Sequence, residues 1–256
     1  MAELKALIFD VDGTLAETER DGHRPAFNQA FADTGLAWDW TPELYGQLLE
    51  VSGGKERIRA YVQDYLSDFQ LPAEFDTLDA MIKHLHATKT GYYKQYAAAG
   101  KIPLRPGVER LLNEARSEGV RLAIATTTTP ANVQALLENT LGAESLSWFD
   151  VIAAGDMVPK KKPAPDIFEY ALEHLDLPAD NCLAFEDTNN GLRSATPTGL
   201  KTVVTVNEYT KTQDFTGARL VLSDLGTLDI PFTVLSGNAG KTNYFTVDLA
   251  RQLLSA

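Results

Sequence analysis

Short apolar segments alternate with segments of helical periodicity along most of the chain. Apolar stretches of strand length occur at 4–9, 120–125, 149–154, 182–185, 201–205 and 219–222. Between them, apolar residues spaced three and four positions apart predict helices that begin near Pro106, Pro130 and Pro165. Strands that are joined by single helices form parallel sheets with helices on both faces. The pattern therefore predicts an α/β fold with a doubly wound parallel sheet.

Residues 17–96 interrupt this alternation. Their apolar positions repeat at helical spacing, as in Ile58 and Val62, and we find no strand pattern among them. We therefore expect an inserted all-helical subdomain at 17–96 and a core domain formed by 1–16 and 97–256. Because the insertion leaves the core directly after the first strand, it should cover the carboxyl end of that strand.

Composition and charge exclude several classes of protein. The chain has 256 residues, 44% of them hydrophobic, and a net charge of -12, so nucleic acid and anionic membranes would repel it. Its single cysteine, Cys182, excludes an internal disulfide and a cysteine-based zinc site, and we expect a buried, inert thiol. We find no apolar run of membrane-spanning length and no secretory signal. We expect a monomer in the cytoplasm, or in the chloroplast stroma after removal of a transit peptide.

Polar side chains gather at the predicted carboxyl ends of four strands, where ligands bind in sheets of this kind. These residues are Asp10 and Asp12, Thr126, Lys162, and Glu186 with Asp187. Clustered carboxylates resist ionising together unless a cation joins them, and Mg²⁺ prefers such oxygen ligands together with phosphate. Lysine and threonine suit the oxygens of a phosphoryl group. The sequence therefore predicts a magnesium-dependent phosphoryl site.

In this order, Asp10-Val11-Asp12-Gly13-Thr14, Thr126, Lys162 and Glu186-Asp187 resemble the four motifs of the haloacid dehalogenase (HAD) superfamily of phosphatases. The resemblance covers nearly all of the chain and implies a Rossmann-like core with a C1-type cap formed by the helical insertion. Residues 53–57, 104–107 and 162–168 are also similar to the CbbY-type phosphatases of that superfamily. Those relatives remove a phosphate from xylulose-1,5-bisphosphate, a misfire product that inhibits Rubisco, the carboxylase of the Calvin cycle.

The resemblance implies a catalytic role for four residues. Asp10 would be the nucleophile that forms an aspartyl-phosphate. Asp12 would protonate the leaving sugar oxygen and later activate water, a pairing that also argues against the dehalogenases of the superfamily. Thr126 would donate a hydrogen bond to the phosphoryl oxygens, and Lys162 would balance the negative charge.

The resemblance also implies the ligands of Mg²⁺. Asp10, the backbone carbonyl of Asp12 and Asp187 would hold the ion. Glu186 could bind it directly or orient a bound water, and the sequence leaves both possibilities open.

The cap should supply specificity for a small phosphorylated sugar. A bisphosphate needs a positive site for the phosphate that is not cleaved, and Lys55 and Arg57 behind Gly54 are the candidates. Thr127 and Thr128, beside the predicted phosphoryl-binding threonine, are candidate contacts to phosphate or sugar. Each of these residues could instead be an ordinary surface or capping residue.

Where the chain passes into the cap, the resemblance places Glu17, His23 and Arg24 near the sugar hydroxyls. The segment 19–23 is one residue longer than in bacterial relatives, which leaves the register of His23 open. Lys89 aligns loosely with a cap lysine of related mutases.

Two other functions would use the same residues: a phosphomutase such as β-phosphoglucomutase, and a non-catalytic phosphoacceptor or sensor. Asp12 argues against the second, because a stable phospho-aspartate needs no group that activates water. Residues 237–242 resemble part of a P-loop, but Leu235 stands in place of the first glycine. We expect a surface turn there with no strand leading into it. Pro197 should shorten or kink the helix that follows Asn190.

Overall fold

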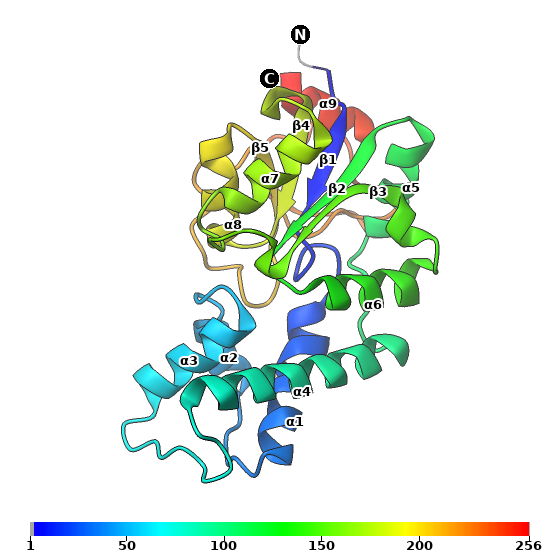
Figure 1. Cartoon of the computed structure of the whole chain (residues 1–256). Coiled ribbons are helices and arrows are strands. Elements are labelled where there is room, and N and C mark those ends of the chain that lie inside the picture. The colour runs from blue at the N-terminus through cyan, green and yellow to red at the C-terminus, as the bar shows by residue number, and fades with distance from the viewer. Residues whose placement is uncertain (1–2, 256) are drawn as a thin grey trace.

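The computed structural model describes residues 3–255 and contains a seven-stranded sheet whose strand ends face a group of helices (Figure 1). The strand order is β3-β2-β1-β4-β5-β6-β7, and every neighbouring pair is parallel except β6 with β7. The strands are β1 (Ala6–Phe9), β2 (Arg121–Thr126), β3 (Phe149–Ala154), β4 (Cys182–Glu186), β5 (Lys201–Thr205), β6 (Leu220–Leu222) and β7 (Val234–Gly237). The order reverses between β1 and β4, which is where such sheets form a binding crevice.

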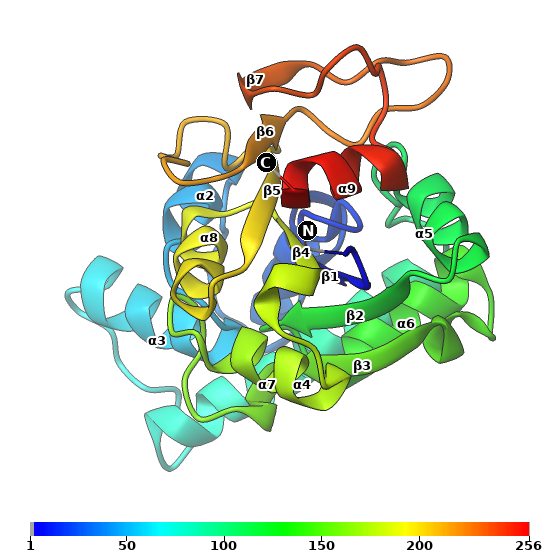
Figure 2. The same cartoon turned by 90° about the horizontal axis from the view of Figure 1, so that it is seen from above.

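Helices cover both faces of the sheet, as the alternation of the sequence predicts. In β1, Leu7 and Phe9 point to one face while Ala6 and Ile8 point to the other, and all four are fully buried. The first face packs against α5 (Val108–Ser117), α6 (Pro130–Leu141) and α9 (Val247–Ser255). The second packs against α7 (Asp166–Leu175) and α8 (Asn189–Ala195), and Figure 2 shows the two layers from above. The predicted doubly wound α/β fold is therefore confirmed.

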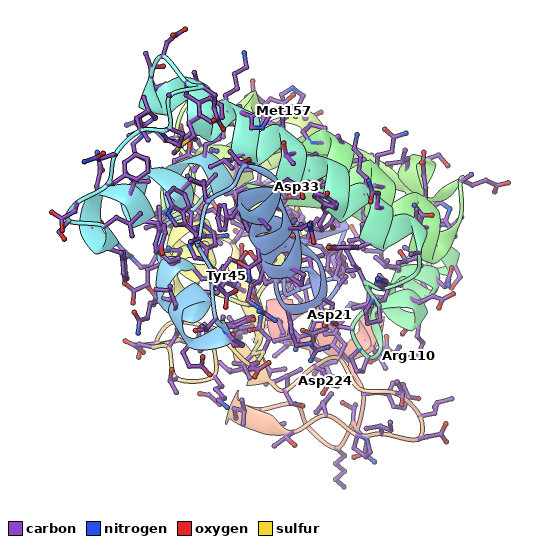
Figure 3. All side chains as sticks on the ribbon, turned by 90° about the horizontal axis from the view of Figure 1, so that it is seen from below. Asp21, Asp33, Tyr45, Arg110, Met157 and Asp224 are labelled. Carbon is purple, nitrogen blue, oxygen red and sulfur yellow. The ribbon has the colours of Figure 1, made fainter. Side chains whose placement is uncertain are left out.

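Between β1 and α5 the described residues form helices and no strand. These helices are η1 (Glu19–His23), α1 (Arg24–Asp33), α2 (Pro42–Leu48), α3 (Gly54–Tyr65) and α4 (Leu78–Ala98), and we refer to them together as the cap. The cap has its own aromatic interior, in which Phe27, Phe31, Trp40 and Tyr45 are fully buried. It lies beyond the carboxyl ends of the strands, with α4 packed on α6 (Figure 1). Figure 3, seen from the cap side, shows Tyr45 on α2.

Short helical turns complete the connections. They are η2 (Ser145–Trp148), η3 (Gly155–Met157), η4 (Ala179–Asn181) and η5 (Thr196–Thr198). The helix α8 ends one residue before η5, in which Pro197 stands, so the proline shortens the helix as predicted. Cys182 is buried in β4, as expected. None of the described helices combines the length and apolar character that crossing a membrane requires.

One expectation about the strands is wrong. Residues 237–242 form a surface turn as predicted, but a strand of the sheet, β7, does lead into that turn. All four residues of β7 are exposed and pair only with β6, so no alternation of buried and exposed positions marks this edge strand in the sequence. Because β7 is antiparallel and ends in a turn, it does not form the strand-to-helix connection of a P-loop.

A buried arginine joins the strand ends to the loop that follows β1. The Arg105 guanidinium donates hydrogen bonds to the carbonyls of Gly13, Thr205 (2.8 Å), Val206 (2.5 Å) and Ser223 (2.9 Å). Its Nε lies 3.2 Å from a carboxylate oxygen of Glu17, and only 5% of Arg105 is exposed. One side chain thus satisfies carbonyls at the ends of β5 and β6 and in the loop that carries Asp12.

We expect the substitution Arg105→Met to lower the free energy of unfolding by about 3–5 kcal/mol, because buried carbonyls and a carboxylate would lose a charged donor. Urea denaturation followed by circular dichroism measures the change. Arg59→Met is the matched control, since its ion pair with Asp79 is exposed and should contribute less than about 1 kcal/mol. A similar small loss for both variants would contradict the role of Arg105.

Candidate active site

Parallel pairing places the predicted motif residues next to one another. Phe9 in β1 is in register with Ile124 of β2 and with Phe185 of β4, so the residues that follow these positions emerge at the same edge. The Lys162 ammonium reaches this edge and donates to Asp10 Oδ1 (2.6 Å), Glu186 Oε1 (2.5 Å) and the Ala125 carbonyl (2.9 Å). Residues more than 150 positions apart in the sequence thus share one buried hydrogen-bonded group.

Three buried carboxylates lie close together at this edge, and two of them contact the lysine. Asp10, Glu186 and Asp187 each offer an oxygen, and these atoms all lie within 4.8 Å of one another. Burial raises the pKa of Asp10 to about 7, although Lys162 lowers it, and burial and the nearby Asp10 raise the pKa of Asp187. One ammonium balances only part of this negative charge. The excess charge and the hard oxygen donors suit a divalent cation such as Mg²⁺.

The loop after β1 approaches Asp187 closely because it contains glycine. Gly13 has a φ of 78°, and a Cβ atom there would lie 2.2 Å from Asp187 Oδ2. The same oxygen accepts a hydrogen bond of 2.6 Å from Asn207 Nδ2, and Thr14 Oγ1 lies 3.4 Å from Oδ1. Sequence reasoning missed Asn207, because it lies outside the motifs in the segment after β5. It fixes the orientation of Asp187.

Glu186 is held on both of its oxygens by the protein. Oε1 accepts from Lys162, and Oε2 accepts from the backbone N–H of Asp187 (3.2 Å). A Cβ atom on Gly191 would lie 1.9 Å from this carboxylate, so the start of α8 packs directly against it. The carboxylate of Glu186 therefore has little room to turn.

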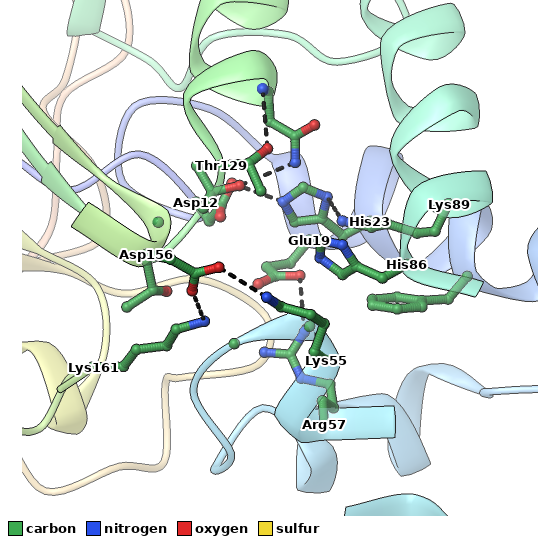
Figure 4. A pocket seen from close by; sticks show the side chains of 17 residues that line it. Asp12, Glu19, His23, Lys55, Arg57, His86, Lys89, Thr129, Asp156 and Lys161 are labelled. Carbon is green, nitrogen blue, oxygen red and sulfur yellow. Dashed lines mark hydrogen bonds and ion pairs between the residues drawn. The ribbon is translucent and has the colours of Figure 1, made fainter. Parts of the chain in front are cut away.

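The side chain of Asp12 points away from this cluster and toward the cap. His23 Nε2 lies 3.0 Å from Asp12 Oδ1, and Lys89 Nζ lies 2.8 Å from His23 Nδ1 (Figure 4). Since an ammonium can only donate, Nδ1 accepts from Lys89 and Nε2 donates to Asp12. Burial lowers the pKa of Lys89 to about 8. Burial raises the pKa of Asp12, but His23 and Lys89 outweigh it and bring the pKa to about 2, so they favour the carboxylate form.

The helix η1 determines where His23 lies, which the sequence left open. It is a π-helix of five residues, Glu19–His23, and the wider turn of a π-helix accommodates one extra residue. His23 is thereby buried against Asp12, with 3% of its surface exposed. Glu19, which sequence reasoning did not select, is turned toward the cavities between cap and core.

Two adjoining cavities of about 40 and 60 Å³ lie between cap and core. Both are lined by Asp12, Glu19, Arg57 and Thr127. The first, drawn in Figure 4, also contains Gly54, Lys55, Thr128 and Lys89, and the second contains Asp10, Lys162, Glu186 and Asp187. Pockets for small-molecule ligands typically measure about 300–1,000 Å³. The cap must therefore move before a ligand of that size can enter.

Two cap cations reach the first cavity in different ways. Arg57 is buried and donates to the Leu48 carbonyl (3.1 Å) and to Tyr45 Oη (3.0 Å), which fixes its position. The Lys55 ammonium is more exposed and lies 2.8 Å from Asp156 Oδ2. The cap thus brings one buried and one partly exposed positive charge to the cavity.

Some predicted residues lie elsewhere. Glu17 pairs with Arg105 and lines neither cavity, and its place near the sugar stays a prediction. Arg24, which directly follows the π-helix, lines a separate surface cavity with Tyr96 and Lys101. Thr126 also lines neither cavity. Its buried Oγ1 accepts from the backbone N–H of Thr128 at 3.3 Å, which leaves its own proton free to donate.

Comparison with known proteins gives matches over most of this chain. Residues 4–197 match the family model described as haloacid dehalogenase-like hydrolase. Protein CbbY of Rhodobacter capsulatus is 50% identical over 87% of this chain and 94% of its own length. A crystal structure of a CbbY mutant from Rhodobacter sphaeroides in complex with xylulose-1,5-bisphosphate is 44% identical, with a TM-score of 0.79 over 88% of this chain and 98% of that one. A β-phosphoglucomutase from Clostridium difficile shares the fold, with 21% identity and a TM-score of 0.67 over 85% of this chain and 90% of that one.

We expect Mg²⁺ at about one hundred times its dissociation constant to raise the melting temperature by about 5 °C or more, because binding to the folded state stabilises it. Asp187→Asn should lose at least half of this shift. It should also melt higher than the wild type without Mg²⁺, since one buried negative charge is removed. Differential scanning fluorimetry with EDTA reversal measures both effects.

Asp214→Asn is the control for this measurement, because Asp214 is exposed and lies outside the carboxylate cluster. It should keep the full shift. Equal Mg²⁺ shifts in the wild type and in Asp187→Asn would exclude the cluster as the metal site.

Proposed function

Because the chain belongs to the haloacid dehalogenase-like hydrolases and is a phosphatase, we propose that it hydrolyses a sugar bisphosphate through an aspartyl-phosphate on Asp10. The observation that carries this proposal is the Lys162 ammonium bound to Asp10 (2.6 Å) and Glu186 (2.5 Å), with Asp187 beside them. Residues 1–16 and 97–256 would form the catalytic core and 17–96 the cap that encloses the substrate.

We propose xylulose-1,5-bisphosphate as the substrate and xylulose-5-phosphate as the product. The support is the 50% identity to a CbbY protein and the 44% identity to a CbbY whose structure contains this bisphosphate. In a cell with Rubisco, the reaction would clear an inhibitor of the Calvin cycle.

In the first step, a carboxylate oxygen of Asp10 attacks the phosphorus of the phosphate that is removed. The bond between phosphorus and the sugar oxygen breaks, and Asp12 donates its proton to that oxygen. The negative charge of a phosphoryl group beside Asp12 raises the pKa of this carboxyl and favours its protonated form. Lys162 holds one oxygen of Asp10 and so orients the attacking carboxylate.

In the second step, water attacks the phosphorus and the bond to Asp10 breaks, which releases inorganic phosphate. Asp12 accepts the proton of this water and so ends the step protonated, as the first step requires. His23 Nε2 donates to Asp12 throughout and keeps the carboxyl in place. Thr126 and Thr127 would donate to phosphoryl oxygens.

The carboxylate cluster would hold Mg²⁺ through Asp10, Asp187 and the backbone carbonyl of Asp12. The ion would neutralise negative charge on the phosphoryl oxygens when bound. We propose that Glu186 orients a metal-bound water, because protein groups already donate to both of its oxygens.

The uncleaved phosphate would bind among the cap cations Lys55 and Arg57, near Thr128. Arg57 is held rigidly by the Leu48 carbonyl and Tyr45, and it supplies a fixed positive charge over the cavity. Lys55 stands at the start of α3 behind Gly54. Closure of the cap would exclude water from the aspartyl-phosphate.

We expect Asp10→Asn to lower the rate of phosphate release from xylulose-1,5-bisphosphate at least about 1,000-fold, because an amide cannot serve as the nucleophile. A phosphate-release assay measures this. The exposed Asp214→Asn serves again as control and should keep wild-type activity. Wild-type turnover of any phosphate ester by Asp10→Asn would end the proposal.

The wild-type enzyme should also be distinguishable from a phosphomutase. With glucose-1-phosphate and a trace of glucose-1,6-bisphosphate, a mutase makes glucose-6-phosphate, whereas a phosphatase releases inorganic phosphate. We expect only phosphate release.

We expect Lys55→Ala to raise KM for xylulose-1,5-bisphosphate about 10-fold and to change the hydrolysis of a small monophosphate less than about 2-fold, because only the bisphosphate places a charge in the cap. Steady-state kinetics with p-nitrophenyl phosphate as the monophosphate provides the comparison. Lys83→Ala, an exposed cap lysine on α4, is the control. Equal effects of Lys55→Ala on both substrates would refute a distal-phosphate role.

A further inference from the structure

A second cluster of charged groups joins the cap to the core at the rim of the first cavity. From the cap helix α3 come Lys55 and Glu56, and from the core segment after β3 come Asp156 and Lys161. The Asp156 carboxylate forms ion pairs with both lysines: Lys55 Nζ lies 2.8 Å from Oδ2, and Lys161 Nζ lies 3.1 Å from Oδ1 (Figure 4). Lys161 also lies 3.2 Å from Glu56. The four side chains alternate in charge across the boundary between cap and core.

The cap loop passes close to Lys161 and Glu56 at Gly53. Gly53, directly before α3, has a φ of 98°, and a Cβ atom there would lie 2.9 Å from Lys161 Nζ. A glycine at this place lets the cap loop approach the core lysine. The Lys161 side chain is only 17% exposed, although it stands in a run of three lysines that suggests a solvated surface. Its position is therefore specific to this boundary.

The Asp156 carboxylate is paired with both of the lysines that face the cavity rim. Its hydrogen bonds with Lys55 and Lys161 lower its pKa to about 2, so the carboxylate stays charged. It is also the partner closest to solvent, with 63% of its side chain exposed. Exposed ion pairs are individually weak, so a group of higher charge can replace a carboxylate in them. A phosphate carries more charge and three acceptor oxygens.

We propose that the Asp156 carboxylate is a built-in competitor for the distal phosphate: it holds Lys55 and Lys161 when cap and core are together, and the second phosphate of a bisphosphate displaces it. This inference rests on the proposed sugar-bisphosphate substrate. It assigns Lys161 of the core, together with Lys55 of the cap, to the distal phosphate. A monophosphate whose only phosphate lies at Asp10 does not displace Asp156 from the two lysines. These lysines therefore contribute nothing to its affinity.

Competition between the Asp156 carboxylate and the distal phosphate predicts in which direction the dissociation constant changes in each variant. Removing the competing carboxylate frees two lysines and should tighten binding of the bisphosphate, whereas removing Lys161 should weaken it. An ion-pair cluster that only fastened the cap would respond with the same sign to both changes, because either one breaks the same contacts.

Binding is measured by calorimetry with xylulose-1,5-bisphosphate in the Asp10→Asn background, where turnover is blocked. Adding Asp156→Asn should lower the dissociation constant about 5-fold, and adding Lys161→Met should raise it about 5-fold. Asp150→Asn is the matched control, since Asp150 is an exposed acid of β3, the strand that precedes Asp156, and it pairs with Arg121 instead. It should change the dissociation constant less than about 2-fold. Asp156 and Lys161 lie at the boundary between cap and core. The melting temperature of each variant shows whether it is folded.

Failure of this inference differs from failure of the proposed function. If the wild type releases phosphate from the bisphosphate but Asp156→Asn binds it no more tightly than the background does, the competitor role alone is overturned. Changes of the same sign in Asp156→Asn and Lys161→Met would also overturn it. If the wild type hydrolyses no sugar bisphosphate, the function and the inference fall together.

Discussion

Three buried carboxylates lie together, and one buried ammonium pairs with two of them; the rest of the structure serves to hold this group in place. Asp10, Glu186 and Asp187 would repel one another, and the single Lys162 offsets only part of their charge. Such a group is unfavourable for folding unless rigid elements enforce it. Parallel strands hold these residues together, because adjacent strands end side by side and the residues that follow them emerge at the same edge of the sheet.

The surroundings of the cluster show how closely it is packed. Gly13 leaves space that a Cβ atom would take from Asp187, and Asn207 fixes one oxygen of that carboxylate. Arg105 ties the loop after β1 to the ends of β5 and β6 through backbone carbonyls. The chemistry therefore depends on residues outside the motifs, which act by restricting the positions of those within them.

The cap places positive charge where the core has an excess of negative charge. His23 and Lys89 orient Asp12 and favour its carboxylate form while no phosphoryl group is bound, and Arg57 supplies a fixed cation over the strand ends. The cavities enclosed between cap and core are too small for a phosphorylated sugar, so contacts between the two parts must break and re-form in each catalytic cycle. Weak, partly exposed ion pairs such as that between Lys55 and Asp156 suit this requirement, because they hold the cap without locking it.

The sequence alone determined the sheet, the helical insertion and the motif residues at the strand ends, because buried strands and amphipathic helices leave periodic patterns and strand order places their ends together. It missed β7, an exposed edge strand without such a pattern. It selected His23, which lines a cavity between cap and core, but it also selected Glu17 and Arg24, which line neither of these cavities, and it omitted Glu19, which lines both. Only the tertiary structure decided these points. Two features depend on contacts between segments that are far apart in the chain: the direction in which a side chain leaves the π-helix, and the partner that a cap charge meets across a cavity. Local sequence patterns do not indicate such contacts.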